Sequence, residues 1–436
     1  MPSSTKGHYD DHYPTLVAVP RPHPPLPSRI VVAMSGGVDS STVAAMLKAE
    51  GHEVIGITLQ LYDHGLVVGK KGACCAGKDI YDAQMAAERL SIPHYVFDYE
   101  SAFKEEVIDK FIDGYIKGET PIPCILCNQK VKFRDLLRAA RQLNADAMAT
   151  GHYVRKIVND FGESELHKAV DENKDQSYFL FTTTQEQLDF LMFPLGGMNK
   201  DETRKLARSY GLELADKPDS QDICFVPNGD YRQVIEKIRP GSFIQGNIVD
   251  SYGAILGGHN GIINYTVGQR RGIGIANEQA IYVVAIDAAK NEVIVGTKDK
   301  LKGKNLLIRD INWLGREIKE DDEVECLVKL RSTHKGSTAK LRMLDNDMAY
   351  VTLYEEYFAI TPGQACVVYG VDSSLNPSKR QLSDLERGLS QCIDGTPIGL
   401  NRKAHDATTA DTDNSSFIHY TRVLGGGWIE KEIKDT

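Results

Sequence analysis

Apolar and polar positions in residues 29–154 follow two different periods along the chain. Short apolar runs with β-branched residues, which are typical of buried strands, occupy residues 30–34, 54–61, 93–99 and 145–154. Apolar residues recur at helical spacing in residues 41–50, 79–90, 103–117 and 128–143. Strands that alternate with helices predict a parallel sheet wrapped by helices. We therefore expect an α/β domain over residues 29–227, with its ligand beyond the carboxyl ends of the strands.

The pattern changes after this sheet. Two strands at 154–158 and 163–170 flank an Asn-Asp-Phe-Gly turn and predict a hairpin. Asn199 with Glu202 has the spacing of a capping box, so we expect a helix there that ends at Gly211.

Glycines become dense beyond residue 228, and short strands alternate with turns. This pattern predicts a small β-rich central domain over residues 228–304. Regularly spaced strands from residue 305 predict a closed C-terminal β-barrel over residues 305–436. The polar stretch 373–416 interrupts the strand pattern, so we expect it to be a mobile insertion.

Composition and apolar run length bear on the location of the protein in the cell. The chain has 436 residues, of which 42% are hydrophobic, and no apolar run approaches the length of a membrane span. Residues 1–28 lack the apolar core of a secretory signal and read as a disordered tail, so we expect a cytoplasmic location and no membrane partner. A net charge of −9 means that any binding of RNA has to use local basic patches.

The turn Ser35–Ser40, Ser-Gly-Gly-Val-Asp-Ser, joins the first strand to the first helix. Adjacent glycines let a ligand approach the backbone, and a helix start presents free N–H groups that favour a phosphate. The hydroxyls of Ser35 and Ser40 add donors, and Asp39 is placed to hold a metal ion or to cap the helix. The P-loop signature is absent. The alternative is an ordinary turn between a strand and a helix.

Two cysteines are candidates for thiol chemistry. Cys127 comes just before a predicted helix with Lys130, Lys132 and Arg134 in its early turns, so we expect a lowered thiol pKa. Cys224 lies in a second loop, and only the fold can bring it to Cys127. A disulfide requires Cα atoms within about 7 Å.

Other interpretations of these cysteines stay open. The eight cysteines of this long chain suggest reduced thiols, either catalytic or metal-bound. Cys124-x-x-Cys127 with Cys74, Cys75 or Cys224 is a candidate set for an iron–sulfur cluster, although a single C-x-x-C is a weak metal signal. The alternative to a catalytic role for Cys224 is that it is a buried thiol without a function.

Several basic residues are candidates for contact with RNA. The helix 128–141 carries a basic run that is either a solvated face or a phosphate-binding surface, namely Lys130, Lys132, Arg134, Arg138 and Arg141. Arg270 and Arg271 either meet phosphate or border a β turn, with equal support.

Six motifs occur in one order: SGGVDSS, PIPCILCN, ATGHYV, KDQSYFL, DSQDICF and TVGQRRGIGI. Together they resemble the bacterial tRNA-uridine 2-sulfurtransferase family of the PP-loop ATP pyrophosphatase superfamily, over roughly residues 29–370 and 417–430. The resemblance implies that ATP, with Mg²⁺, adenylates the 2-carbonyl oxygen of the wobble uridine of tRNA. It further implies that Cys224 carries a persulfide from a cysteine desulfurase or sulfur-relay protein. Cys127 then frees the sulfur and leaves a transient Cys127–Cys224 disulfide.

The same resemblance assigns binding residues. The residues implied for ATP are Ala33, Met34, Ser35, Gly36, Gly37, Val38, Asp39, Ser40, Leu59 and Gly151. Those implied for tRNA are Ile122, Pro123, Cys124, His152, Lys174, Asp175, Gln176, Arg331, Ser332 and Gln364. His152 as a core histidine is the alternative for that position. Ile122 departs from the asparagine that the family commonly has before this proline, and Cys124 stands at a variable position.

Two rival functions remain. Another PP-loop enzyme that adenylates a small molecule would need neither loop cysteine. A catalytically silent RNA-binding or iron–sulfur protein would bind tRNA without consuming ATP, and an iron–sulfur-dependent RNA thiolase would use Cys124 and Cys127 as cluster ligands.

Overall fold

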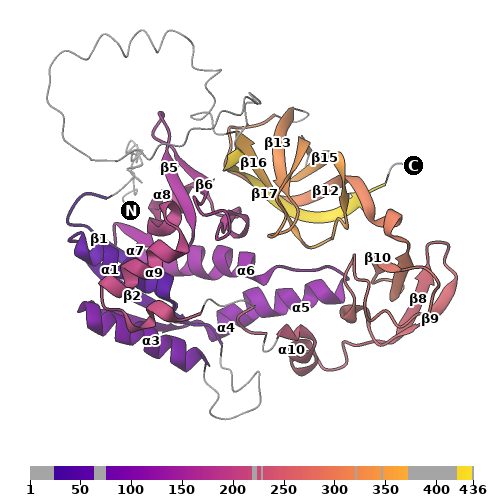
Figure 1. The fold of residues 1–436 in the computed structure, drawn as a ribbon, viewed down its shortest axis with the longest axis horizontal. Helices are drawn as coiled ribbons and strands as arrows, with labels where there is room; N and C mark the ends of the chain where they lie inside the picture. The colour runs from indigo at the N-terminus through magenta and orange to yellow at the C-terminus, as the bar shows by residue number, and fades with distance from the viewer. Residues whose placement is uncertain are drawn as a thin grey trace, which may run out of the picture.

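Three sheets organise the chain (Figure 1). The computed structural model describes residues 24–62, 75–218, 223–226, 229–319, 322–344, 347–371 and 420–434. The expected insertion 373–416, most of the expected tail 1–28, and Cys74 lie outside these residues.

The first sheet is parallel and five-stranded, in the order β3-β2-β1-β4-β7. Its strands are β1 (Arg29–Ala33), β2 (Glu53–Gln60), β3 (His94–Asp98), β4 (Ala147–Ala149) and β7 (Leu191–Met192). One face packs against α1 (Val38–Ala49), α3 (Cys75–Leu90) and α9 (Lys200–Ser209). The opposite face packs against the helix that contains Phe133 and against barrel residues such as Tyr369. The predicted α/β domain is therefore confirmed.

Two long helices in this domain contain stretches of π-helix. The first consists of α4 (Glu100–Phe103), η1 (Lys104–Ile108) and α5 (Asp109–Ile116). The second consists of α6 (Pro123–Leu126), η2 (Cys127–Leu136) and α7 (Leu137–Gln142). This second helix begins five residues before the expected start, because Pro123 occupies its first turn, where the fixed φ of proline suits a helix.

Short elements complete the domain. The capping box is confirmed at α9, where the Glu202 N–H donates to Asn199 Oδ1 at 2.9 Å and the Asn199 N–H donates to Glu202 Oε2 at 2.8 Å. The chain leaves this helix through Gly211, whose φ is +70°. The remaining helices are η3 (Ser177–Leu180), α8 (Gln185–Phe190), η4 (Pro194–Gly197) and η5 (Glu213–Asp216).

The predicted hairpin forms and joins a different sheet. Strands β5 (Val154–Val158) and β6 (Ser164–Lys168) pair antiparallel, and β6 pairs with the last strand of the barrel through Arg422 and His167. The expected strand 145–154 is split between β4 and β5. The hairpin thus links the parallel sheet to the barrel, through a long-range pairing that no local pattern encodes.

The C-terminal barrel closes with six strands, as predicted. The order is β12-β15-β14-β13-β16-β17, and β12 pairs with β17. The strands are β12 (Lys302–Trp313), β13 (Glu323–Lys329), β14 (Ser337–Leu344), β15 (Met348–Phe358), β16 (Ala365–Val371) and β17 (Tyr420–Ile433). An apolar core that includes Ile308, Val351 and Val368 fills its interior.

The central region contains a four-stranded sheet in the order β10-β11-β8-β9. Its elements are α10 (Tyr231–Ile238), β8 (Gly246–Asp250), β9 (Ile255–His259), η7 (Ile262–Asn264), β10 (Tyr282–Asp287), β11 (Glu292–Gly296) and η8 (Lys298–Leu301). Tyr231 of α10 stacks on Tyr115 of α5 with ring centroids 4.3 Å apart. The sheet therefore lies at the end of α5, away from the parallel sheet (Figure 1).

Within the described ranges, the structure has no helix with the length and apolar character needed to cross a membrane. The cytoplasmic location stays a prediction.

Substitution of two adjacent glycines tests how closely the hairpin packs against the chain at Gly196. A Cβ at Gly196 would overlap the carbonyl oxygen of Val154, whereas a Cβ at Gly197 would meet no atom within 4 Å. We expect Gly196→Ala to lower the free energy of unfolding by about 2 kcal/mol or more, because β5 has to shift. Gly197→Ala should stay within about 0.5 kcal/mol of wild type in urea unfolding. Equal stabilities for the two variants would contradict this packing.

Candidate functional site

The glycine turn lies at the carboxyl end of β1, at the start of α1. Gly36 has φ of +70°, and a Cβ there would overlap the backbone of Asp79 in α3, so the turn needs glycine at this position. Gly37 has only the Ser35 hydroxyl near its missing Cβ. The Ser35 N–H donates to Ser40 Oγ at 3.1 Å, which shapes the turn. The backbone is thus open to a ligand at the start of α1.

Two lysines that the sequence analysis missed contact this turn. Lys217 Nζ donates to the Gly36 carbonyl at 2.8 Å and pairs with Asp79 at 2.8 Å and Asp82 at 2.5 Å. Lys200 Nζ pairs with Asp39 at 2.7 Å. Lys200 is the first residue of the capping-box helix and Lys217 precedes the Cys224 motif, but neither position signals a contact with the turn.

Asp39 does not cap α1, contrary to one of the two roles expected for it. The residue lies inside the first turn of the helix, and its carboxylate accepts hydrogen bonds from Lys200 and from the Tyr153 hydroxyl at 2.9 Å. Gly151 packs against the start of α1, since a Cβ at Gly151 would lie 2.8 Å from the Ser40 nitrogen. Leu59 is half-buried between two apolar clusters. The turn and Gly151 are therefore neighbours, as their expected roles require.

The fold brings Cys224 to the second helix. Phe225 packs edge-on against Phe103 and Phe111, with ring centroids 5.7 and 5.3 Å apart. The Tyr62 hydroxyl donates to the Cys224 carbonyl at 2.7 Å. These contacts place the Cys224 thiol where Cys127 and Cys124 both act on it electrostatically. All three cysteines are free thiols, with Cys127 buried and the other two exposed.

The resting thiols are protonated rather than activated. Desolvation by the surrounding protein atoms raises the pKa of Cys127 and of Cys124, although Cys124 reaches the surface. The same desolvation, together with the neighbouring cysteines, raises the pKa of Cys224 to about 12, although this residue also has exposed surface. The expectation of a lowered pKa at Cys127 is therefore wrong. Its backbone N–H is bonded within the helix that begins at Pro123, so it gains no free helix start, and apolar side chains surround the thiol. Lys132 alone opposes this shift at Cys127.

A metal centre is not formed by the residues that the structure describes. No group of three or more His, Cys, Asp or Glu side chains among them is arranged to hold a metal ion. Cys74 of the alternative cluster set lies outside those residues, and the side chain of Cys75 does as well.

The basic residues of the second helix lie in different environments. Arg134 pairs with Glu106 at 3.1 Å and with Asp135 at 2.8 Å, and Arg141 pairs with Glu186 at 2.6 Å. The charge of Lys132 acts on the three thiols and lowers their pKa values. The run is therefore not a single basic face.

The residues expected to contact tRNA also lie in different environments. Asp175 accepts hydrogen bonds from Ala169 and Ser177, and Gln176 Oε1 accepts one from the Tyr153 N–H at 2.9 Å. These bonds account for both side chains within the protein. Lys174 is half-buried in the same segment.

His152 lies against Phe133 and hydrogen-bonds Thr150. Burial and the charge of Lys132 hold its pKa well below the ordinary value, so the ring is neutral at pH 7. Any contact of His152 with RNA is therefore one of a neutral imidazole.

The barrel residues expected at tRNA lie close to the Cys124 segment. Gln364 Nε2 donates to the Thr120 carbonyl at 2.8 Å, just before half-buried Ile122 and buried Pro123. Arg331 donates to Thr361 Oγ1 at 2.9 Å, and Ser332 beside it is exposed. The barrel thus supports the segment that leads into the helix of Cys124.

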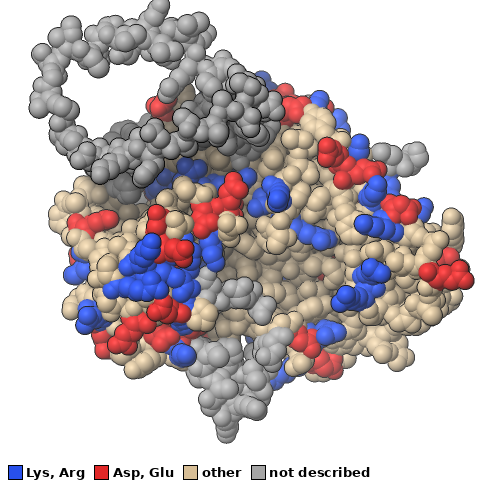
Figure 2. Space-filling view, in the orientation of Figure 1, with Lys and Arg blue, Asp and Glu red and all other residues tan. Residues whose placement is uncertain are grey.

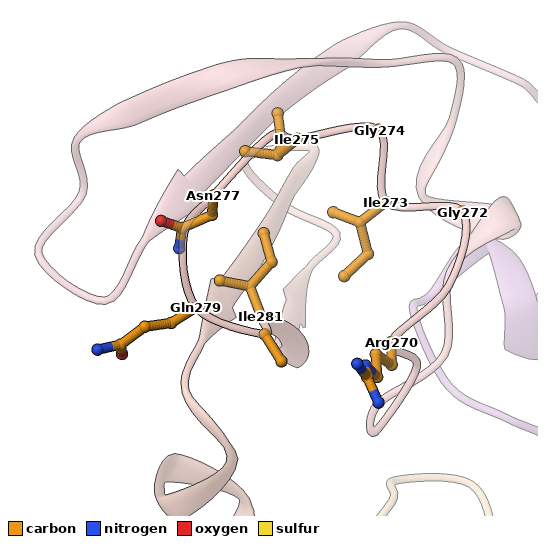
Figure 3. A pocket seen from close by; sticks show the side chains of 9 residues that line it. Arg270, Gly272, Ile273, Gly274, Ile275, Asn277, Gln279 and Ile281 are labelled. Carbon is orange, nitrogen blue, oxygen red and sulfur yellow. The ribbon is translucent and has the colours of Figure 1, made fainter.

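The loop before β10 forms a shallow hollow of about 270 Å³ (Figure 3). Arg270, Gly272, Ile273, Asn277 and Gln279 are among its lining residues. A second hollow on the other side of Gly272 is lined by Arg271 and Gln269. The loop begins near the barrel, because a Cβ at Gly268 would lie 3.8 Å from the Arg331 guanidinium. Both arginines are exposed at this edge.

Charges of both signs are interspersed over the face in Figure 2, and the middle of that face carries few charged side chains. Contact with a polyanion on this face would therefore depend on individual cations rather than on a broad basic field.

The fold thus consists of a parallel-sheet domain with a glycine turn of the phosphate-binding type and neighbouring thiols, followed by a central sheet and a barrel. Three family models match in the same order. They are a tRNA methyl transferase HUP domain at residues 28–228, a tRNA methyl transferase PRC-barrel domain at 232–297 and an aminomethyltransferase β-barrel domain at 303–375.

Curated relatives identify the family. A tRNA-specific 2-thiouridylase MnmA from Rickettsia conorii is 61% identical over 407 residues, which are 93% of this chain and 96% of that protein. A tRNA-specific 2-thiouridylase MnmA from Rickettsia africae is 61% identical over 78% of this chain and 93% of that protein. The chain belongs to the MnmA family of tRNA sulfurtransferases.

Solved structures show only a distant likeness. A 4-thiouridine synthetase in complex with RNA and ATP matches with a TM-score of 0.31 and 17% identity, over 48% of this chain and 51% of that one. An NMN synthetase from Francisella tularensis matches with a TM-score of 0.28 and 17% identity, over 44% of this chain and 66% of that one.

The raised pKa of Cys224 predicts an unusual pH profile. Because the thiolate is the nucleophile and the pKa is about 12, alkylation by iodoacetamide should rise about tenfold per pH unit from pH 8 to 10 without levelling off. The same cysteine in urea-unfolded protein should level off near its ordinary pKa of 9. Site-resolved mass spectrometry measures both rates. A plateau near pH 9 in the folded protein would show that burial does not control this thiol.

Proposed function

We propose that this enzyme thiolates the 2-position of the wobble uridine of tRNA, with ATP as the activating substrate and a cysteine persulfide as the sulfur source. The observation that carries the proposal is the placement of the Cys224 thiol beside Cys127 in a domain whose glycine turn is open to a phosphate ligand. Sequence identity to tRNA-specific 2-thiouridylases across most of the chain supports the same reaction.

ATP binds at the turn Ser35–Ser40, where N–H groups and hydroxyls meet its phosphates. Lys217 and Lys200 pair with carboxylates at this turn and are candidate cations for the phosphates. The oxygen donors Asp39 and Asp79 suit Mg²⁺, which when bound neutralises triphosphate charge. The uridine 2-oxygen attacks the α-phosphate, pyrophosphate leaves, and the base carries an adenylate.

Sulfur then replaces the adenylated oxygen. The terminal sulfur of a Cys224 persulfide attacks C2 of the uracil ring, and AMP leaves with the former carbonyl oxygen. The Cys127 thiolate attacks the Cys224 sulfur, so the bond to the transferred sulfur breaks and a Cys127–Cys224 disulfide forms. The two electrons that the sulfur gains come from the two cysteines, and an external thiol reductant restores them.

Partners follow from this chemistry. A cysteine desulfurase or sulfur-relay protein loads exposed Cys224. The uridine has to leave the base stack to reach the turn and the thiol. Residues near Cys124 contact that base, while Lys174, Ser332, Arg270 and Arg271 supply surface contacts to the tRNA.

A small-molecule adenylating enzyme and an iron–sulfur-dependent RNA thiolase are the competing functions. The first gives no role to the neighbouring thiols of Cys224 and Cys127. The second needs cluster ligands, and the described residues present no group of three.

Cysteine substitutions test the reaction. With unmodified tRNA, ATP, Mg²⁺ and a persulfide donor, we expect 2-thiouridine and AMP from wild type, and at least a hundredfold less 2-thiouridine from Cys224→Ser and Cys127→Ser. AMP release separates loss of activation from loss of sulfur transfer. Cys326→Ala, which removes a buried barrel thiol, is the control and should retain activity.

The outcomes separate the functions. Thiolation by Cys224→Ser at the wild-type rate would refute the persulfide role. A brown, iron-containing protein whose activity requires the iron would favour the cluster-dependent thiolase.

Salt dependence tests Arg270 and Arg271. Each lost phosphate contact reduces the slope of log K against log salt by about 1, so the double variant R270Q/R271Q should bind tRNA more weakly with a slope reduced by about 2. Lys290→Gln is the control, since Lys290 lies at an exposed turn of the same sheet and pairs with Asp287. An unchanged slope in R270Q/R271Q would remove these arginines from the tRNA surface.

A further inference from the structure

The second helix is a π-helix over ten residues, from Cys127 to Leu136. π-Helices are rare, occur mostly as single turns and are frequent at functional sites. This one starts at the cysteine expected to attack the persulfide. The helix buries Cys127 and Val131 in one apolar cluster and Phe133 and Leu136 in another, so its rotation is fixed on both sides.

The π-helical hydrogen bonding affects where Lys132 lies around the helix relative to Cys127. In a regular α-helix each residue advances about 100°, so a residue five positions after Cys127 would be turned roughly 140° away from it. In a π-helix the hydrogen bonds join residues i and i+5, so each residue advances by less than in an α-helix and position i+5 comes back toward the face of position i. Lys132 is five positions after Cys127. The helix type therefore brings the Lys132 position toward the face of the attacking thiol.

The electrostatic pattern agrees with this geometry. Lys132 lowers the pKa of Cys124, of Cys127 and of Cys224, against the effect of burial. The same charge depresses the pKa of His152. The titratable groups that share this environment are Cys124 from α6, Cys224 from the loop 223–226 and His152 from the segment after β4. Lys132 is the cation common to all of them.

We propose that Lys132 is a positioning residue for the thiol chemistry, in which its ammonium group holds the Cys127 thiolate ready to attack the Cys224 persulfide. Lys132 forms no covalent bond and gives up no proton. The proton of Cys127 goes to solvent, and the ammonium compensates the negative sulfur inside an apolar pocket. The inference rests on the proposed function, since it assigns a group that supports Cys127 in that reaction.

A different role for Lys132 would be a phosphate contact with tRNA, because it belongs to the basic run of this helix. The burial of Cys127, at 7% exposure, favours the thiol role, since a thiolate there needs a nearby cation that is independent of RNA. A test without tRNA separates the two roles.

The experiment measures alkylation of each cysteine by iodoacetamide between pH 6 and 10, in the full-length protein without tRNA, by site-resolved mass spectrometry. We expect Lys132→Met to slow alkylation of Cys127 about tenfold at pH 8 and to move its pH profile up by about one unit, while Lys132→Arg restores most of the rate. Lys130→Met is the matched control, because Lys130 lies two residues earlier on the same helix and should leave the profile unchanged.

The outcomes are distinct. A Cys127 profile in Lys132→Met that equals that of wild type overturns the inference, and so does an equal shift in Lys130→Met. If Lys132→Met does not fold, Lys132→Gln and Lys132→Arg are compared instead, and identical profiles for these two refute a role of charge. The proposed function is tested in a different assay, in which failure of wild type to form 2-thiouridine would overturn it. The alkylation assay contains neither tRNA nor ATP, so its result does not depend on that outcome.

Discussion

The edge-on packing of Phe225 against Phe103 and Phe111 is the contact on which the thiol site depends. Cys224 comes from a short loop far along the chain from Cys127, and this aromatic contact fixes the loop against the helix that starts at Glu100. Aromatic pairs in this geometry add about 0.5–1.5 kcal/mol each beyond the area they bury. The Tyr62 hydroxyl holds the backbone at Cys224 itself. The approach of Cys224 to the helix of Cys127, which the proposed sulfur transfer requires, depends on this buried anchor.

The barrel has a part in the same site although it carries none of the reacting groups. Its residue Arg309 pairs with Glu119 at 3.1 Å, and Gln364 and Pro362 hydrogen-bond the backbone of Thr120. These bonds fix the loop that leads into the helix of Cys124 and Cys127. The barrel, which we expect to contact tRNA, thus also sets the position of the segment expected to meet the target base.

Sequence patterns predicted the elements whose cause is local. The glycine turn, the capping box at Asn199 and the closed barrel follow from residue type and spacing. Lys200 and Lys217 were missed because their contacts with Asp39 and Gly36 cross the fold, and the partner of the hairpin β5–β6 was missed for the same reason. The pKa of Cys127 was misjudged because the helix starts at Pro123, five residues before the expected start, so Cys127 lies inside the helix and not at its free end.

The raised thiol pKa values have a physical consequence for this chemistry. A site that buries Cys127 keeps it protonated at rest, so the thiol is protected from chance oxidation. The reaction nevertheless needs an anionic sulfur, and burial alone would make it costly. A fixed cation within the same helix reconciles the two demands, because it favours the anion without admitting water. The π-helical segment supplies that cation at a spacing that a regular helix would turn away from the thiol.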